Sequence, residues 1–277
     1  MLSDREIIST LDMVRSEHLD VRTVTLGVSL FDCVSHDLDL FIGNMRAKLR
    51  KYASNLVSVC NEVGDKYGIP VVNKRISVSP IAVVGGPFGP DGMVRICQAL
   101  DEAAQEAGVD FLGGFSALVE KGFAHGDKAL IEAIPEALAT TERVCSSINI
   151  ASSRAGINMD AAALMGRQIL ETARATADRG GFGCTKLVVF CNIPQDVPFM
   201  AGAYLGVGEP DCVINVGVSG PGVVKKAIDR ALEKSRSQGC GLSLLKVSEV
   251  IKRTAYKVTR VGEIIGNEVA ERLGIPF

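Results

Sequence analysis

Apolar runs alternate along the chain with amphipathic segments, and this order predicts strands that are followed by helices. Residues 21–31 alternate apolar and small polar side chains, as a strand with one better-buried face does. Apolar residues spaced three and four apart predict one long helix over 38–64, which Gly68 ends. The short apolar runs 186–191 and 212–218 are typical of strands that are buried on both faces. Because strands and helices alternate at least five times, the sequence predicts an α/β protein with a mostly parallel sheet or barrel.

Proline and glycine interrupt this pattern in the first half of the chain. A second strand begins at Ile69 and continues to Val84, with Pro80 breaking or bulging it. The segment 85–92 is too rich in glycine and proline for regular structure, and a helix over 93–107 follows it. The remaining predicted strands cover 109–112 and 144–150. Further helices are predicted after Asp127, after Asn158 or Asp160, over 223–232 and over 242–273.

The amino-terminal segment is charged and already has the pattern of a helix. Ser3 and Glu6 form a capping box ahead of apolar residues at helical spacing. No apolar run approaches the roughly 18–20 residues that are needed to span a bilayer. We therefore predict a cytoplasmic protein that has no membrane partner.

Composition and charge narrow the class of protein further. A chain of 277 residues with 47% hydrophobic side chains can bury a sizeable core, and we predict a single α/β domain over 1–277. Thirty basic and 32 acidic residues leave a net charge of −2 with no basic stripe, which argues against nucleic acid as a partner. Eight cysteines lie far apart without a CxxC or CxxH spacing, which argues against a zinc site and a disulfide scaffold.

Three long segments carry a resemblance to a known family. They are GFAHGDKALIEAIPEALATTERVCSSINIASSRAGINMDAA (122–162), FCNIPQDVPFMAGAYLGVGEPDCVINVGVSGPGVVKKAI (190–228) and TAYKVTRVGEIIGNEVAERLGIPF (254–277). They resemble the uncharacterised prokaryotic family labelled "PFL family protein", over essentially the whole chain. The resemblance implies an α/β barrel like that of pyruvate formate-lyase, with two five-stranded parallel half-sheets set antiparallel to one another. It also implies a homodimer, and it implies no established reaction.

Members of that family continue past Phe277, and a weak internal sequence repeat agrees with this. NEVGDKYGIP (61–70) and NEVAERLGIP (267–276) share residues at the same spacing, and each ends a helix where a strand should begin. Chance similarity is the alternative, because glycine often ends a helix ahead of an apolar strand. We expect the chain to lack a C-terminal part of the barrel.

Glycyl radical chemistry, which the fold analogy suggests, is not supported by the sequence. It needs a segment of the type Arg-Val-x-Gly-aromatic, and residues 260–263, RVGE, lack the intervening residue and the aromatic residue. Cys145, Cys191 and Cys212 are therefore interpreted as core residues rather than radical carriers.

The loop between 192 and 211 holds the first group of candidate site residues. Asp196, Glu209 and Asp211 have hard oxygen donors that suit magnesium or calcium, or they act as a general acid and base. The alternative is that these residues form turns around the prolines of the loop. His125 is the histidine in the most polar loop and is a candidate base, unless its imidazole is satisfied by Asp127 or solvent.

The strand-to-helix turn that follows is a candidate anion site. Ser219, Gly220 and Gly222 lead from an apolar run into a helix, so backbone amides and the helix dipole can hold an anion. The alternative is a tight turn in which Ser219 caps the helix.

Two classes of function follow from these candidates. In one, the protein is an enzyme that acts on a small anionic metabolite with a divalent cation, and the metabolite is held by the 219–222 turn. In the other, the same pocket belongs to a non-catalytic metabolite-binding protein or sensor. A pocket has the same residues in both classes, so the sequence leaves both open.

Overall fold

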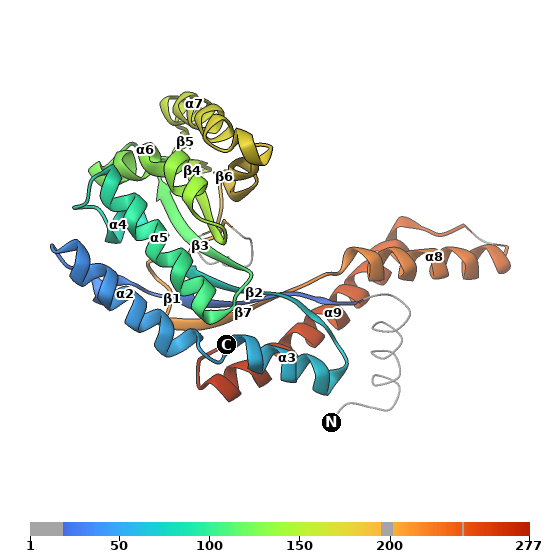
Figure 1. Ribbon diagram of the computed structural model, residues 1–277. Coiled ribbons are helices and arrows are strands. Elements are labelled where there is room, and N and C mark those ends of the chain that lie inside the picture. The colour runs from blue at the N-terminus through green and yellow to red at the C-terminus, as the bar shows by residue number, and fades with distance from the viewer. Residues whose placement is uncertain (1–18, 195–201, 240) are drawn as a thin grey trace.

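A seven-stranded mixed sheet runs through the described residues, with helices packed against it (Figure 1). The structure is a computed structural model that describes residues 19–194, 202–239 and 241–277. The predicted helix at the amino terminus lies outside these ranges. The strands are β1 (Val21–Val28), β2 (Val71–Val78), β3 (Phe111–Leu118), β4 (Val144–Ser152), β5 (Gly156–Ile157), β6 (Leu187–Cys191) and β7 (Cys212–Val218). The α-helices are α2 (Leu38–Ala53), α3 (Leu56–Tyr67), α4 (Ile81–Val84), α5 (Pro90–Ala107), α6 (His125–Thr140), α7 (Met159–Ala175), α8 (Pro221–Ser237) and α9 (Leu244–Leu273).

The pairing of the strands sets which loops meet at each edge of the sheet. The order is β5-β4-β3-β2-β1-β7, and β6 also pairs with β4. Strands β1, β2, β3, β4 and β6 run parallel to one another, whereas β7 runs antiparallel to β1 and β5 runs antiparallel to β4. The carboxyl ends of the parallel strands therefore share one edge, and the start of β7 lies at that same edge. The predicted α/β architecture with mostly parallel strands and crossover helices is confirmed at this level.

Several predicted element boundaries are wrong, and residues with special backbone chemistry explain three of the differences. The single helix predicted over 38–64 is two helices, because Asn55 leaves helical geometry between α2 and α3. Asparagine favours such breaks because its side chain competes for backbone hydrogen bonds. The strand predicted to reach Val84 stops at Val78, because Pro80 cannot donate to the sheet and instead precedes α4. The segment 85–92, predicted to be irregular, becomes helical at Pro90, the first residue of α5.

The core lies between the sheet and its helices, and a loop covers part of the sheet near its carboxyl edge. Phe41 and Met45 of α2 are fully buried. The amide of Leu205 donates to the carbonyl of Val78 at 2.9 Å, which holds residues 202–206 beside the end of β2. A Cβ on Gly27 would lie 2.9 Å from Leu205, so the loop packs directly on β1. This loop then leads to Asp211 at the start of β7.

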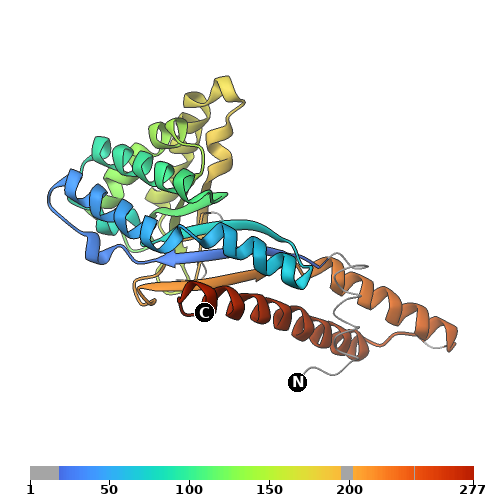
Figure 2. The same cartoon turned by 60° about the horizontal axis from the view of Figure 1, so that its bottom comes forward.

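Helices α8 and α9 lie side by side and extend past the sheet as an arm (Figure 1 and Figure 2). The inner half of α9 packs against β7, where a Cβ on Gly262 would lie 3.0 Å from Val218. Glu268 of α9 contacts Lys66 of α3 at 2.9 Å, and hydrogen bonds, first from Lys66 and then from Arg272, lower the pKa of Glu268 to about 2. Helix α9 therefore connects the arm to the sheet and to α3.

Candidate functional site

The carboxyl edge of the parallel strands brings together loops from most of the chain. The segments after β1, β2, β3, β4 and β6 begin there, and the loop that leads into β7 ends there. In open α/β sheets this edge is where ligands bind, because loops and helix amino termini converge on it.

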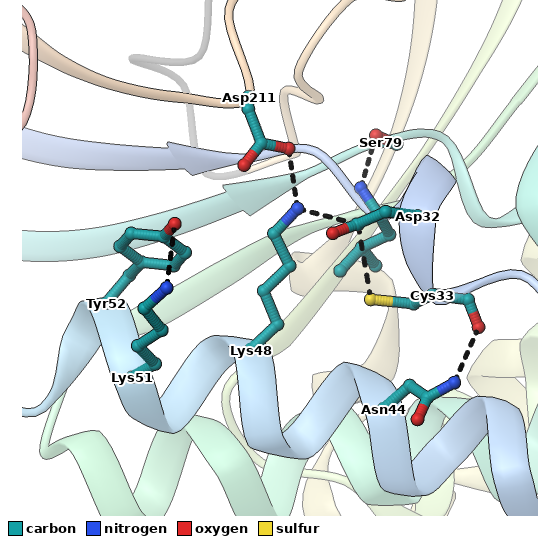
Figure 3. Close-up of polar contacts among 9 residues, drawn as sticks. Asp32, Cys33, Asn44, Lys48, Lys51, Tyr52, Ser79 and Asp211 are labelled. Atoms are coloured by element: carbon teal, nitrogen blue, oxygen red, sulfur yellow. Dashed lines mark hydrogen bonds and ion pairs between the residues drawn. The ribbon is translucent and has the colours of Figure 1, made fainter.

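A buried lysine on α2 connects two acidic residues at this edge (Figure 3). The Nζ atom of Lys48 lies 2.7 Å from Oδ1 of Asp32, which follows β1, and 2.6 Å from Oδ1 of Asp211, which precedes β7. We call Asp32, Lys48 and Asp211 the Lys48 cluster. Backbone amides hold the chain beside both acidic residues: the amide of Leu30, two residues before Asp32, donates to Ser79 Oγ at 3.1 Å, and the amide of Ser29 donates to the carbonyl of Asp211 at 2.8 Å.

The charges of the Lys48 cluster are unequally exposed. The Lys48 side chain is 8% exposed, whereas those of Asp32 and Asp211 are 63% and 59% exposed. Burial by itself would lower the pKa of Lys48, but hydrogen bonds to Asp211 and Asp32 outweigh it and raise that pKa. The hydrogen bond from Lys48 lowers the pKa of Asp32. Near neutral pH the cluster therefore has two acidic side chains that are exposed to solvent, and both contact one buried ammonium group.

A thiol lies against the same cluster and is held in its protonated form. The Sγ atom of Cys33 lies 3.6 Å from Oδ1 of Asp32, and the residue is 3% exposed. Burial, followed by the negative charge of Asp32, raises the pKa of the Cys33 thiol to about 12. A thiol in this state is neither a nucleophile nor a ready metal ligand.

We expect thiol reagents to discriminate sharply between two cysteines at this edge. At about pH 8, roughly one in ten thousand Cys33 side chains would be ionised. Cys191, at the end of β6, is exposed, so its interpretation as a core residue is wrong. Iodoacetamide should therefore alkylate Cys191 much faster than Cys33, as peptide mass mapping over time can show. Denatured protein, in which both thiols are accessible, is the control; equal rates in the folded protein would contradict the buried, protonated state of Cys33.

Of the predicted acidic residues, the structure places Asp211 in the Lys48 cluster and Glu209 nearby on the same loop. Glu209 is half-buried, and its amide donates to the carbonyl of Gly206 at 3.2 Å in a turn. Asp196 lies outside the described residues. No group of three histidine, cysteine, aspartate or glutamate side chains suited to a metal ion occurs in the described part of the chain.

His125 is exposed and is the first residue of α6, so it does not belong to a polar loop. The prediction that Asp127 is the residue that caps this helix is wrong, because Ala124 precedes the first residue of α6. Asp127 is the third residue of α6, and its Oδ2 accepts a hydrogen bond from the amide of Ala124 at 2.8 Å. Burial raises the pKa of Asp127.

The candidate anion turn lies at the opposite edge of the sheet from Asp211. Val218, at the end of β7, pairs with Val21 at the start of β1, and Gly220 precedes α8. Since β7 has seven residues, about 20 Å separates the turn from Asp211. A surface depression of about 560 Å³ also lies away from the Lys48 cluster, at the end of α3 and the start of β2. Ser219 and Asp211 therefore cannot both contact one small molecule in this arrangement.

Neither Lys48 nor Asp32 was predicted from the sequence, although the helix pattern contains a signal for the lysine. Lys48 is three residues after Met45 and directly before Leu49, which places a charge on the buried stripe of α2. A lysine on such a stripe requires a partner, because an unpaired buried ammonium is costly. Nothing local identifies its partners, which are 16 and 163 residues away.

Comparison with known proteins gives a consistent result over nearly the whole chain. Residues 12–277 match the family described as "Uncharacterised ACR (DUF711)". A "UPF0210 protein" of Desulfovibrio desulfuricans is 82% identical over an alignment of 278 positions that covers 100% of this chain and 60% of that protein. Proteins of the same name in Syntrophobacter fumaroxidans and Methanosarcina mazei are 64% and 55% identical, and this chain again covers 60% and 59% of their lengths.

The chain thus spans about 60% of the length of these curated relatives. A separate observation concerns membranes: in the ranges that the structure describes, no helix is long and apolar enough to cross one.

Proposed function

The chain belongs to the DUF711 family of uncharacterised proteins, and from the geometry of the Lys48 cluster we propose that it is part of an enzyme. The proposed substrate is a small metabolite with a hydroxyl or amine group that donates to the carboxylates of the cluster. One observation carries the proposal: a buried ammonium contacts two half-exposed carboxylates at the carboxyl edge of parallel strands.

The chemistry that suits this arrangement is proton transfer. Asp211 would accept a proton from the substrate, while the hydrogen bond from the ammonium of Lys48 holds its carboxylate in position. Asp32 would bind a second donor group of the same substrate. The cluster carries one net negative charge, so an anionic group of the metabolite would have to be held outside it.

A screen of melting temperature against small metabolites and divalent cations tests the proposal, with a product assay on every compound that raises the melting temperature. The 277-residue chain and a full-length relative should be screened together, because the chain covers about 60% of its relatives. We expect a hit to be converted to product by the full-length protein. Stabilisation without turnover would instead support the alternative class, a metabolite-binding protein or sensor, and would overturn the enzyme proposal.

A divalent cation remains a separate proposal for the same loop. Magnesium or calcium would take oxygen ligands from Asp196, Glu209 and Asp211, as the residue types suggest. The contact between Asp211 and Lys48 opposes this, because a cation would have to compete with the ammonium for the carboxylate.

The remaining site residues also stay proposals. Ser219, Gly220 and Gly222 would bind an anion at the start of α8, and what supports this is that no side chain caps the helix there. His125 would act as a base only for a substrate bound near the start of α6. Neither role depends on the Lys48 cluster.

We also propose a barrel like that of pyruvate formate-lyase for the whole protein. Five parallel strands with an antiparallel β7 beside β1 are consistent with one half-sheet and the beginning of its antiparallel partner. A homodimer, a cytoplasmic location and the absence of a nucleic-acid partner belong to the same proposal. They rest on the family resemblance and on the near-neutral charge.

A further inference from the structure

A second polar group lies at the carboxyl edge, between β3, β4 and the loop that covers the sheet. Asn149, near the end of β4, donates through Nδ2 to Oε2 of Glu120 at 3.3 Å. The amide of Val119 donates to the carbonyl of Asn149 at 2.9 Å, which fixes the backbone at this point. Tyr204, from the loop 202–206, is 3% exposed. The side chains therefore come from three segments that tertiary structure holds in place.

The amide oxygen of Asn149 is the atom that this packing leaves unsatisfied. Asn149 is 5% exposed, and its buried Oδ1 has no hydrogen-bond partner within 19–194, 202–239 and 241–277. The orientation of the amide follows from Glu120, because a carboxylate accepts hydrogen bonds and so must face the NH₂ group. A buried acceptor without a donor is uncommon in proteins and suggests that a donor is supplied from elsewhere.

The surroundings of this acceptor are negative and aromatic. Burial, and then the charge of Glu120, raises the pKa of Tyr204 to about 12, so the phenol lies within electrostatic reach of this carboxylate. Burial raises the pKa of Asp127 of α6, and the negative charge of Glu120 raises it further. A ligand that enters here meets an amide oxygen and carboxylates, so it must bring donors and positive charge.

We propose that Glu120, Asn149 and Tyr204 form a binding site for the protonated primary amine of a small ligand. A primary ammonium has three N–H donors, which match the Asn149 oxygen and the Glu120 carboxylate. The ring of Tyr204 offers a cation a further favourable contact. A divalent metal is the poorer fit, because three acidic, cysteine or histidine ligands do not converge anywhere in the described residues. This inference is independent of turnover at the Lys48 cluster.

Binding of simple amines to the wild-type chain tests the proposal without any substitution. Ethanolamine, methylamine and putrescine are the probes, ethylene glycol is the isosteric control for ethanolamine, and magnesium and calcium are the metal controls. Ligand-observed NMR measures binding and melting temperature measures stabilisation. We expect the amines to bind and to raise the melting temperature, and ethylene glycol to do neither. Binding by no amine, or stabilisation by the metals alone, would overturn the proposal.

Substitutions then place the amine at this site. Glu120→Gln, which keeps the shape of the side chain, should weaken amine binding by about tenfold or more. Glu132→Gln is the matched control, because Glu132 is exposed on the nearby helix α6. Tyr204→Phe keeps the ring and should lower affinity less than Glu120→Gln does. Equal amine affinity in the wild type and in Glu120→Gln would overturn the assignment, whatever the activity of the enzyme.

Discussion

Replacing Gly114 with alanine should lower the free energy of unfolding by about 2–6 kcal/mol. Gly114 lies in β3 with φ +117°, a backbone conformation that residues other than glycine rarely adopt. A Cβ there would lie 2.4 Å from Cγ2 and 2.6 Å from the carbonyl oxygen of Val78 on β2. Backbone strain costs about 1–3 kcal/mol, and overpacking against the adjacent strand adds about 1–3 kcal/mol.

Gly122→Ala separates these two effects. Gly122 has φ +126°, but nothing lies within 4 Å of its added Cβ. Its substitution should therefore cost the strain of about 1–3 kcal/mol alone. Urea unfolding of the wild type and both variants measures the difference. Equal losses for Gly114→Ala and Gly122→Ala would contradict the tight packing of β3 on β2.

Removing both carboxylates of the Lys48 cluster should cost about 3 kcal/mol of stability. In the double variant Asp32→Ala/Asp211→Ala, the 8% exposed side chain of Lys48 keeps its charge and loses both partners. Each single variant should lose much less, because one carboxylate still contacts the ammonium. Adding Lys48→Met to the double variant should restore most of the loss, since no buried charge remains. Urea unfolding of the five proteins measures this; losses that simply add would contradict the shared ammonium.

The dependence of stability on pH follows from the directions of the two pKa shifts. The folded state lowers the pKa of Asp32, so this contribution is present above the unfolded pKa and is lost as pH falls through the folded pKa. The folded state raises the pKa of Lys48, so that contribution is present below the unfolded pKa and is lost as pH rises through the folded value. The stabilisation therefore spans the neutral range and weakens in acid and in strong base.

Local pattern predicted the elements of this fold better than it predicted their pairing. The apolar run at 212–218 correctly indicated a strand, but its antiparallel pairing with β1 joins segments far apart in sequence. That pairing is what carries Asp211 to Lys48 and takes Ser219 to the other edge. Periodicity also continued through Asn55, because α2 and α3 both bury one stripe against the same core. A break that leaves the apolar pattern intact gives no periodic signal.

Of the candidate site, only one member could be predicted from the sequence. Polar residues in a loop between two strands pointed to Asp211, since carboxylates in such loops often carry function. Asp32 follows a strand without any motif around it, and Lys48 belongs to a helix that otherwise has an ordinary apolar stripe. The cluster exists because three segments converge, which no single stretch of sequence describes.

Turnover by variants of the Lys48 cluster tests the central claim most directly. The measurement is kcat/KM for a substrate identified in the metabolite screen, in the wild type and in Asp211→Asn. The account predicts a loss of about 100-fold or more for Asp211→Asn, the range for a missing acid or base. Asp229→Asn is the control, since Asp229 pairs with Lys225 on the exposed surface of α8, and it should leave kcat/KM unchanged. Wild-type kcat/KM in Asp211→Asn would contradict the account.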